Sequence, residues 1–79
     1  MRVIADIPHP HLKITLFSWN NKYLIKLERG VLEQTYKVSE LDLTGVDDVR
    51  RLLDDDFLAG VLRRFDEMND AFYQALSRV

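Results

Sequence analysis

Two closely spaced turn signals constrain this chain more than any other feature of its sequence. Asn20-Asn21 is a candidate two-residue hairpin loop, because Asn tolerates the left-handed backbone angles that a type I′ turn requires. Arg29-Gly30 is a second candidate, with Gly where a positive φ is needed. Two such loops predict three consecutive antiparallel strands over residues 12–19, 22–29 and 31–38.

The turns also predict how the strands pair, since residues directly opposite each other share a face and side chains alternate along a strand. Around the first turn Trp19 pairs with Lys22, and around the second turn Glu28 pairs with Val31. One face then collects apolar and aromatic residues and is predicted to be buried. These residues are Leu12, Ile14, Leu16, Tyr23, Ile25, Leu27, Leu32, Tyr36 and Val38.

The opposite face of the predicted sheet is a candidate interaction surface. Phe17, Trp19 and Leu24 lie together on it. Helices on one side of a sheet leave its other face in solvent, so an exposed apolar patch there calls for an explanation. Basic residues surround the patch, and two glutamates share the face with them: Lys13, Lys22, Lys26, Lys37, Glu28 and Glu33.

Three interpretations of this patch stay open. Lys22 stacks on Trp19 as a cation–π pair that stabilises the hairpin. Alternatively, the aromatic centre with its charged rim is a protein interface. In the third interpretation, Phe17 and Trp19 stack on bases of a single-stranded nucleic acid while Lys22 and Lys26 bind its phosphates. The net charge of −2 disfavours the third interpretation.

The remainder of the chain adds one candidate strand and a helical half. Residues 2–7 alternate weakly and are a candidate fourth strand, which Pro8 and Pro10 would end with a bend. Thr44, with Asp47 three residues later, resembles a capping box and predicts a short helix from residue 46 to about residue 53.

A long amphipathic helix is predicted from residue 57 to about residue 77. Its apolar stripe comprises Leu58, Val61, Leu62, Phe65, Met68, Phe72, Ala75 and Leu76. Asp54-Asp55-Asp56 suits an N-cap and first turn better than a helix interior, and this separates the long helix from the short one. Because the apolar spacing continues across these acids, one unbroken helix over residues 46–77 is the alternative.

These elements predict a single α+β domain over residues 1–79. It is an antiparallel three-stranded meander, four-stranded if residues 2–7 join, followed by a short helix and a long amphipathic C-terminal helix packed on one sheet face. The long helix, at roughly 30 Å, exceeds the width of such a sheet. Phe72, Leu76 and Val79 would then be exposed in a monomer. We therefore expect a homodimer, or another protein partner, with Phe72 or Trp19 in the interface.

No catalytic, cofactor or metal site is predicted, and we do not expect an enzyme. The chain has no Cys, which removes thiolate catalysis and Cys-based zinc sites. His9-Pro10-His11 has no third ligand near it, and the acidic run lacks the alternating acids and central Gly of an EF-hand loop. We assign the histidines to a loop and the acids to a helix start.

The composition, 47% hydrophobic and 30% charged, is typical of a folded soluble domain. No apolar run approaches the roughly 20 residues that span a bilayer. Asp6 and Pro8 interrupt the N-terminal segment before a signal-peptide core can form. With no Cys in the chain, a reducing cytoplasm is the expected location.

The stretch from Ser18 to Tyr36 resembles small bacterial proteins of unknown function. It contains both predicted turns and the strand between them. The resemblance implies no activity, and it assigns a role to no residue of this chain.

Overall fold

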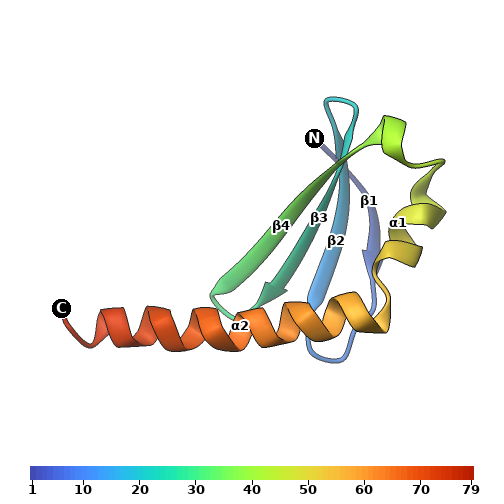
Figure 1. Ribbon diagram of the computed structural model, residues 1–79. Coiled ribbons are helices and arrows are strands. Elements are labelled where there is room, and N and C mark those ends of the chain that lie inside the picture. The colour runs from blue at the N-terminus through green and yellow to red at the C-terminus, as the bar shows by residue number, and fades with distance from the viewer.

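The computed structural model describes all 79 residues and contains a four-stranded antiparallel sheet followed by helices (Figure 1). Strands β1 (Arg2–Ile7), β2 (Lys13–Trp19), β3 (Lys22–Arg29) and β4 (Leu32–Ser39) lie in the sheet in chain order. A 3-10 helix η1 (Glu40–Asp42) and the α-helices α1 (Val46–Leu52) and α2 (Asp55–Leu76) follow. The predicted α+β meander is confirmed, with residues 2–7 as its fourth strand.

The first hairpin has the predicted turn and register. Asn20 and Asn21 form the turn with φ angles of 51° and 59°, as a type I′ loop requires. Trp19 lies opposite Lys22, and the ladder continues without interruption to Lys13 opposite Glu28.

The second hairpin turn lies one residue further along the chain than predicted, so the Arg29-Gly30 assignment was wrong. Arg29 lies opposite Leu32, which leaves Gly30 and Val31 as the turn residues. Gly30 has a φ of 61°, and Val31 does not have a positive φ. This is the pattern of a type II′ turn, which needs Gly only at its first central position.

The pairing of β3 with β4 therefore shifts by two residues. Glu28 lies opposite Glu33 instead of Val31, and Lys26 lies opposite Thr35. Because side chains alternate with a period of two, this shift leaves every residue of β4 on its predicted face.

β1 pairs antiparallel with β2 and contains a bulge. Val3 lies opposite Phe17 and Ala5 lies opposite Leu16, so Ile4 is the extra residue. A bulge of this kind lets two successive residues turn toward the same face and increases the local twist. Both Ile4 and Ala5 pack against the core.

The core lies between one sheet face, here called the inner face, and the two helices. The inner face is the predicted one, and Phe65 packs in the same cluster as Leu16, Ile25 and Leu27, as expected. The nine buried residues of this cluster are Leu12, Ile14, Leu16, Ile25, Leu27, Val49, Leu53, Val61 and Phe65.

Two helices form, and the alternative of one unbroken helix is wrong. The backbone leaves helical geometry at Leu53, with φ −82° and ψ 54°. The Asp54 carboxylate then accepts a hydrogen bond from the Phe57 backbone N–H at 2.8 Å. This N-cap, provided by the acidic run, starts α2 in a new direction.

α2 crosses the inner face and continues past β4, so its C-terminal half projects beyond the sheet (Figure 1). Two contacts follow its path across β4. The rings of Phe57 and Tyr36 meet edge to face with centroids 5.3 Å apart. Gln34 Nε2 donates a hydrogen bond to the Val61 carbonyl oxygen at 3.0 Å. Met68 is the last residue of α2 that packs against the core.

Candidate interaction surfaces

The sheet face opposite the helices, here called the outer face, exposes less apolar area than the sequence indicated. Trp19 is 45% exposed and Phe17 is half-buried, whereas Leu24 is only 7% exposed. Leu24 lies on an interior strand with Phe17 opposite on β2 and Lys37 opposite on β4. These two neighbours flank Leu24, so the prediction that it belongs to an exposed patch was wrong.

The lysines of the outer face differ in the charges that surround them. Lys26 Nζ lies 3.5 Å from a Glu33 carboxylate oxygen and 3.8 Å from one of Glu28. Lys26 therefore forms ion pairs with both Glu28 and Glu33, which lie directly opposite each other on β3 and β4. Lys22 lies opposite Trp19, but the cation–π contact found in the structure joins Arg29 to Phe65 instead.

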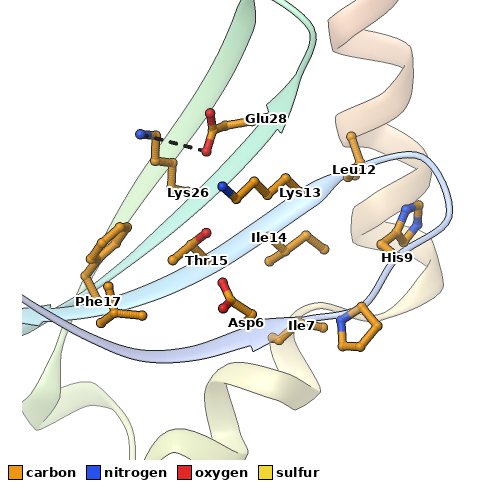
Figure 2. A pocket seen from close by; sticks show the side chains of 12 residues that line it. Asp6, Ile7, His9, Leu12, Lys13, Ile14, Thr15, Phe17, Lys26 and Glu28 are labelled. Carbon is orange, nitrogen blue, oxygen red and sulfur yellow. Dashed lines mark ion pairs between the residues drawn. The ribbon is translucent and has the colours of Figure 1, made fainter.

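A shallow hollow of about 600 Å³ lies on the outer face beside β1 (Figure 2). Thr15, almost fully buried, contributes to its lining. Around it stand Asp6 on β1, Lys13 on β2 and Glu28 on β3, so acids and bases alternate across the surface. Sequence reasoning missed this hollow, because residues from three strands line it together.

The two histidines lie in the β1–β2 loop. The His11 backbone N–H donates to His9 Nδ1 at 3.1 Å, and the two rings meet edge to face with centroids 6.0 Å apart. The chain brings together no group of three or more residues of the types that hold a metal ion. The absence of any cofactor or metal remains a prediction.

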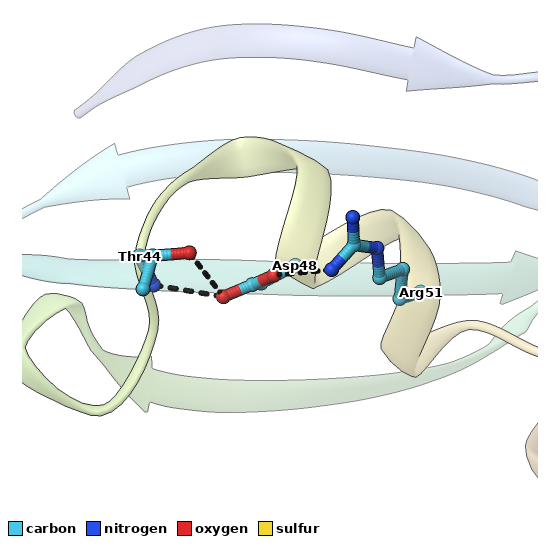
Figure 3. A network of polar contacts seen from close by, with 3 residues as sticks. All are labelled: Thr44, Asp48 and Arg51. Carbon is cyan, nitrogen blue, oxygen red and sulfur yellow. Dashed lines mark hydrogen bonds and ion pairs between the residues drawn. The ribbon is translucent and has the colours of Figure 1, made fainter.

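A polar network at the start of α1 corrects the predicted capping box (Figure 3). Gly45, not Thr44, is the N-cap residue. The carboxylate that reaches back belongs to Asp48 rather than Asp47. Its Oδ2 accepts hydrogen bonds from the Thr44 hydroxyl at 2.6 Å and from the Thr44 backbone N–H at 2.8 Å.

These two hydrogen bonds, the hydroxyl bond first, hold the pKa of Asp48 below its ordinary value. Partial burial opposes the shift, and Arg51, 3.4 Å away, adds to it. The network stabilises the ionised carboxylate at a helix start, where a negative charge is favourable. It has the character of a structural cap.

The second candidate surface is the projecting end of α2, residues 69–79, here called the α2 overhang. Phe72, Tyr73 and Leu76 are between 45% and 51% exposed, and Val79 at the chain end is fully exposed. The predicted exposure of Phe72, Leu76 and Val79 is confirmed. Tyr73 was missed, although its ring lies 5.8 Å from that of Phe72, edge to face.

Comparison of the chain with protein-family models, with curated proteins and with solved structures found no match. Neither helix has the length and apolar character needed to cross a membrane.

Proposed function

We propose that this chain is a non-catalytic interaction module of the cytoplasm that acts as a homodimer through the α2 overhang. One observation supports this most directly: the apolar stripe of α2 is buried where the helix crosses the sheet and exposed where it projects. Phe65 is fully buried, and Phe72, seven residues later on the same side of the helix, is 45% exposed.

Exposed apolar side chains on a projecting helix favour association. Burying one Phe or Leu side chain contributes about 1.5–3 kcal/mol relative to full exposure. In a twofold dimer each such residue is buried in both copies, because both copies present the same surface. Phe72 and Leu76 are therefore the residues that we assign to the interface.

A nucleic-acid-associated regulator is the second candidate function. Trp19 is exposed and lies opposite Lys22, which makes no ion pair. Stacking on an aromatic ring next to a lysine is how some modules hold single strands. The support is weaker than for the dimer, because Phe17 is half-buried and Lys26 is neutralised by Glu28 and Glu33.

Sedimentation equilibrium at micromolar concentration tests the dimer. The wild-type chain should show twice its own mass. Phe72→Ser combined with Leu76→Ser should raise the dissociation constant by about 100-fold or more, because four apolar side chains lose their cover. The helix should persist by circular dichroism, since these residues lie beyond the last core contact of α2.

Gln74→Ser is the matched control, because Gln74 is exposed in the same segment and is not apolar. It should leave the dimer unchanged. A wild-type monomer, or a double variant that dimerises as tightly as wild type, contradicts the proposal.

Trp19 is the only Trp, so its fluorescence reports on the nucleic-acid alternative. A monomer whose Trp19 emission is quenched by a single-stranded oligonucleotide, less so at high salt, would support the nucleic-acid function instead.

A further inference from the structure

We propose that two copies of the chain pair through the free edges of their β4 strands, antiparallel and centred on Thr35, so that the two four-stranded sheets become one. This inference rests on the homodimer proposed above. It adds a second contact between the two copies, the register in which their β4 strands pair, and a role for the partly buried inner face of β4.

The two edge strands of the sheet differ in their capacity to pair. β1 is six residues long and interrupted by a bulge, and bulges discourage pairing with another strand. β4 has eight residues and pairs with β3 without a register shift. Its second edge carries no strand, so alternate backbone N–H and C=O groups there are available to another chain.

The side chains of β4 are self-complementary about Thr35. With two Thr35 residues opposite each other, Glu33 of each copy lies opposite Lys37 of the other. Lys37 makes no ion pair in its own chain, whereas Glu33 is exposed and shares Lys26 with Glu28. Opposite charges at facing positions stabilise a strand pair, and here the pair forms twice.

In the same register the inner-face residues of the two β4 strands also pair apolar with apolar and polar with polar. Leu32 of each copy lies opposite Val38 of the other, and Gln34 lies opposite Tyr36. A register centred on Gln34 or Tyr36 instead would place Glu33 opposite Thr35 or Ser39 and lose both charge pairs. A register centred between two residues would put inner side chains opposite outer ones, which breaks the continuity of the core face.

The inner face of β4 is covered only in part by its own chain. Ile14, Leu16, Ile25 and Leu27 on the interior strands are at most 1% exposed. In contrast, all four inner-face residues of β4 are only partly buried: Leu32, Gln34, Tyr36 and Val38.

The α2 overhang has the direction and length to supply that cover. It projects past β4 (Figure 1), which in the joined sheet is where the second copy begins. From Asp66 to Leu76 is ten residues, about 15 Å along a helix. α2 crosses β4 obliquely, because Phe57 contacts Tyr36, Val61 contacts Gln34 and Asp66 contacts Arg29, so this length spans fewer than about three inter-strand spacings sideways. Phe72 and Leu76 would therefore reach the inner face of the second copy beside its β4 strand, and the symmetry makes the exchange reciprocal.

The two contacts have complementary roles. Pairing of two eight-residue strands buries too little surface for a stable dimer, which needs roughly 1,200–2,000 Å² in total. The overhang adds apolar area but specifies no register. Backbone pairing of β4 and the charges of Glu33 and Lys37 specify how the two copies align.

A cysteine cross-link tests the register directly. The chain has no Cys, so Thr35→Cys introduces a single thiol per copy. Directly opposite residues of two strands are about 5.5 Å or less apart at Cα, within the range that a disulfide spans. Mild oxidation should convert most of the variant to a covalent dimer. Val31→Cys is the control, because in this register its two copies lie far apart, and it should cross-link little.

A charge exchange gives a second test that leaves the fold intact. Glu33→Lys alone places Lys opposite Lys at both sites, and Lys37→Glu alone places Glu opposite Glu. Each variant should dimerise at least about 10-fold more weakly than wild type. An equimolar mixture should restore wild-type affinity as a heterodimer, seen by native mass spectrometry. Arg50→Glu, an exposed charge reversal on α1, should have no effect.

The outcomes separate this inference from the proposed function. A wild-type chain that is monomeric by mass contradicts both. A wild-type dimer in which Thr35→Cys does not cross-link, or in which the mixed charge variants do not recover affinity, overturns the β4 pairing and leaves the homodimer standing.

Discussion

Arg29 and Asp66 form an ion pair at the place where α2 leaves its own sheet. Arg29 Nη2 donates to Asp66 Oδ1 at 3.0 Å, and the same guanidinium lies over the Phe65 ring, 5.2 Å from its centroid. Arg29 is the last residue of β3, so the pair ties the β3–β4 hairpin to the middle of α2. Beyond it the helix makes little further contact with its own sheet.

The two partners of this pair should contribute unequally to stability. Asp66→Ala should lower the free energy of unfolding by less than about 1 kcal/mol, because the Asp66 side chain is 74% exposed. Arg29→Ala should cost more, about 1–2 kcal/mol, since it also removes the cation over Phe65 and the aliphatic cover of the ring. Urea denaturation at one protein concentration measures both. Equal losses would show that the contact with Phe65 contributes nothing.

Truncation of a core side chain on β3 should unfold much of the population. Ile25 is fully buried in the cluster that contains Phe65. Ile25→Ala should lower the free energy of unfolding by about 2–5 kcal/mol, through lost burial and a cavity. Val31→Ala, at an exposed turn position, should change it by less than about 0.5 kcal/mol. Similar values for the two variants would contradict the assignment of the inner face.

The cap of α1 should make stability depend on pH in the acidic range. The folded-state pKa of Asp48 is lowered, chiefly by the Thr44 hydroxyl and backbone N–H. A lowered pKa means that the contribution is complete well above the unfolded value of about 3.9 and is lost as pH falls through the folded value. Asp48→Asn should flatten this part of the pH profile. Asp47→Asn, the neighbouring acid with no such hydrogen bonds, should leave it unchanged.

Divalent metal ions should not stabilise the protein. His9 and His11 lie in one loop without a third ligand, and the acids of α2 start a helix. An ion present at 100 times its dissociation constant adds about 2.7 kcal/mol to the free energy of unfolding. The melting temperature should therefore stay constant when Ca²⁺, Mg²⁺ or Zn²⁺ is added at millimolar concentration. A rise of several degrees with one of these ions would reveal a site that these contacts do not indicate.

The candidate surfaces were only partly predictable from the sequence. The exposure of Phe72 and Leu76 followed from comparing helix length with sheet width, and both quantities are set by local backbone geometry. The burial of Leu24 did not follow, because it depends on side chains of β2 and β4 that flank it across the sheet. The hollow beside β1 was missed for a similar reason, since residues of β1, β2 and β3 line it together.

The sequence by itself determined which residues face the core, where the strands lie and how the first hairpin pairs. These properties are local: a period of two along a strand, and a turn type read from two residues. Even the misplaced second turn preserved the faces, because moving a two-residue turn by one position shifts the pairing by two.

Only the tertiary structure decided that β4 is a free edge and that α2 passes beyond it. Both depend on interactions between distant parts of the chain: the added strand β1 on the opposite side of the sheet, the break at Leu53, and the contacts of Gln34 and Arg29 with α2. The near-symmetry of residues 32–38 is visible in the sequence, but it acquires a meaning only once an unpaired edge and a projecting helix lie together. The side-chain pattern of a strand or helix is set within that segment, whereas the strand order of the sheet and the path of α2 across it are set by contacts between segments.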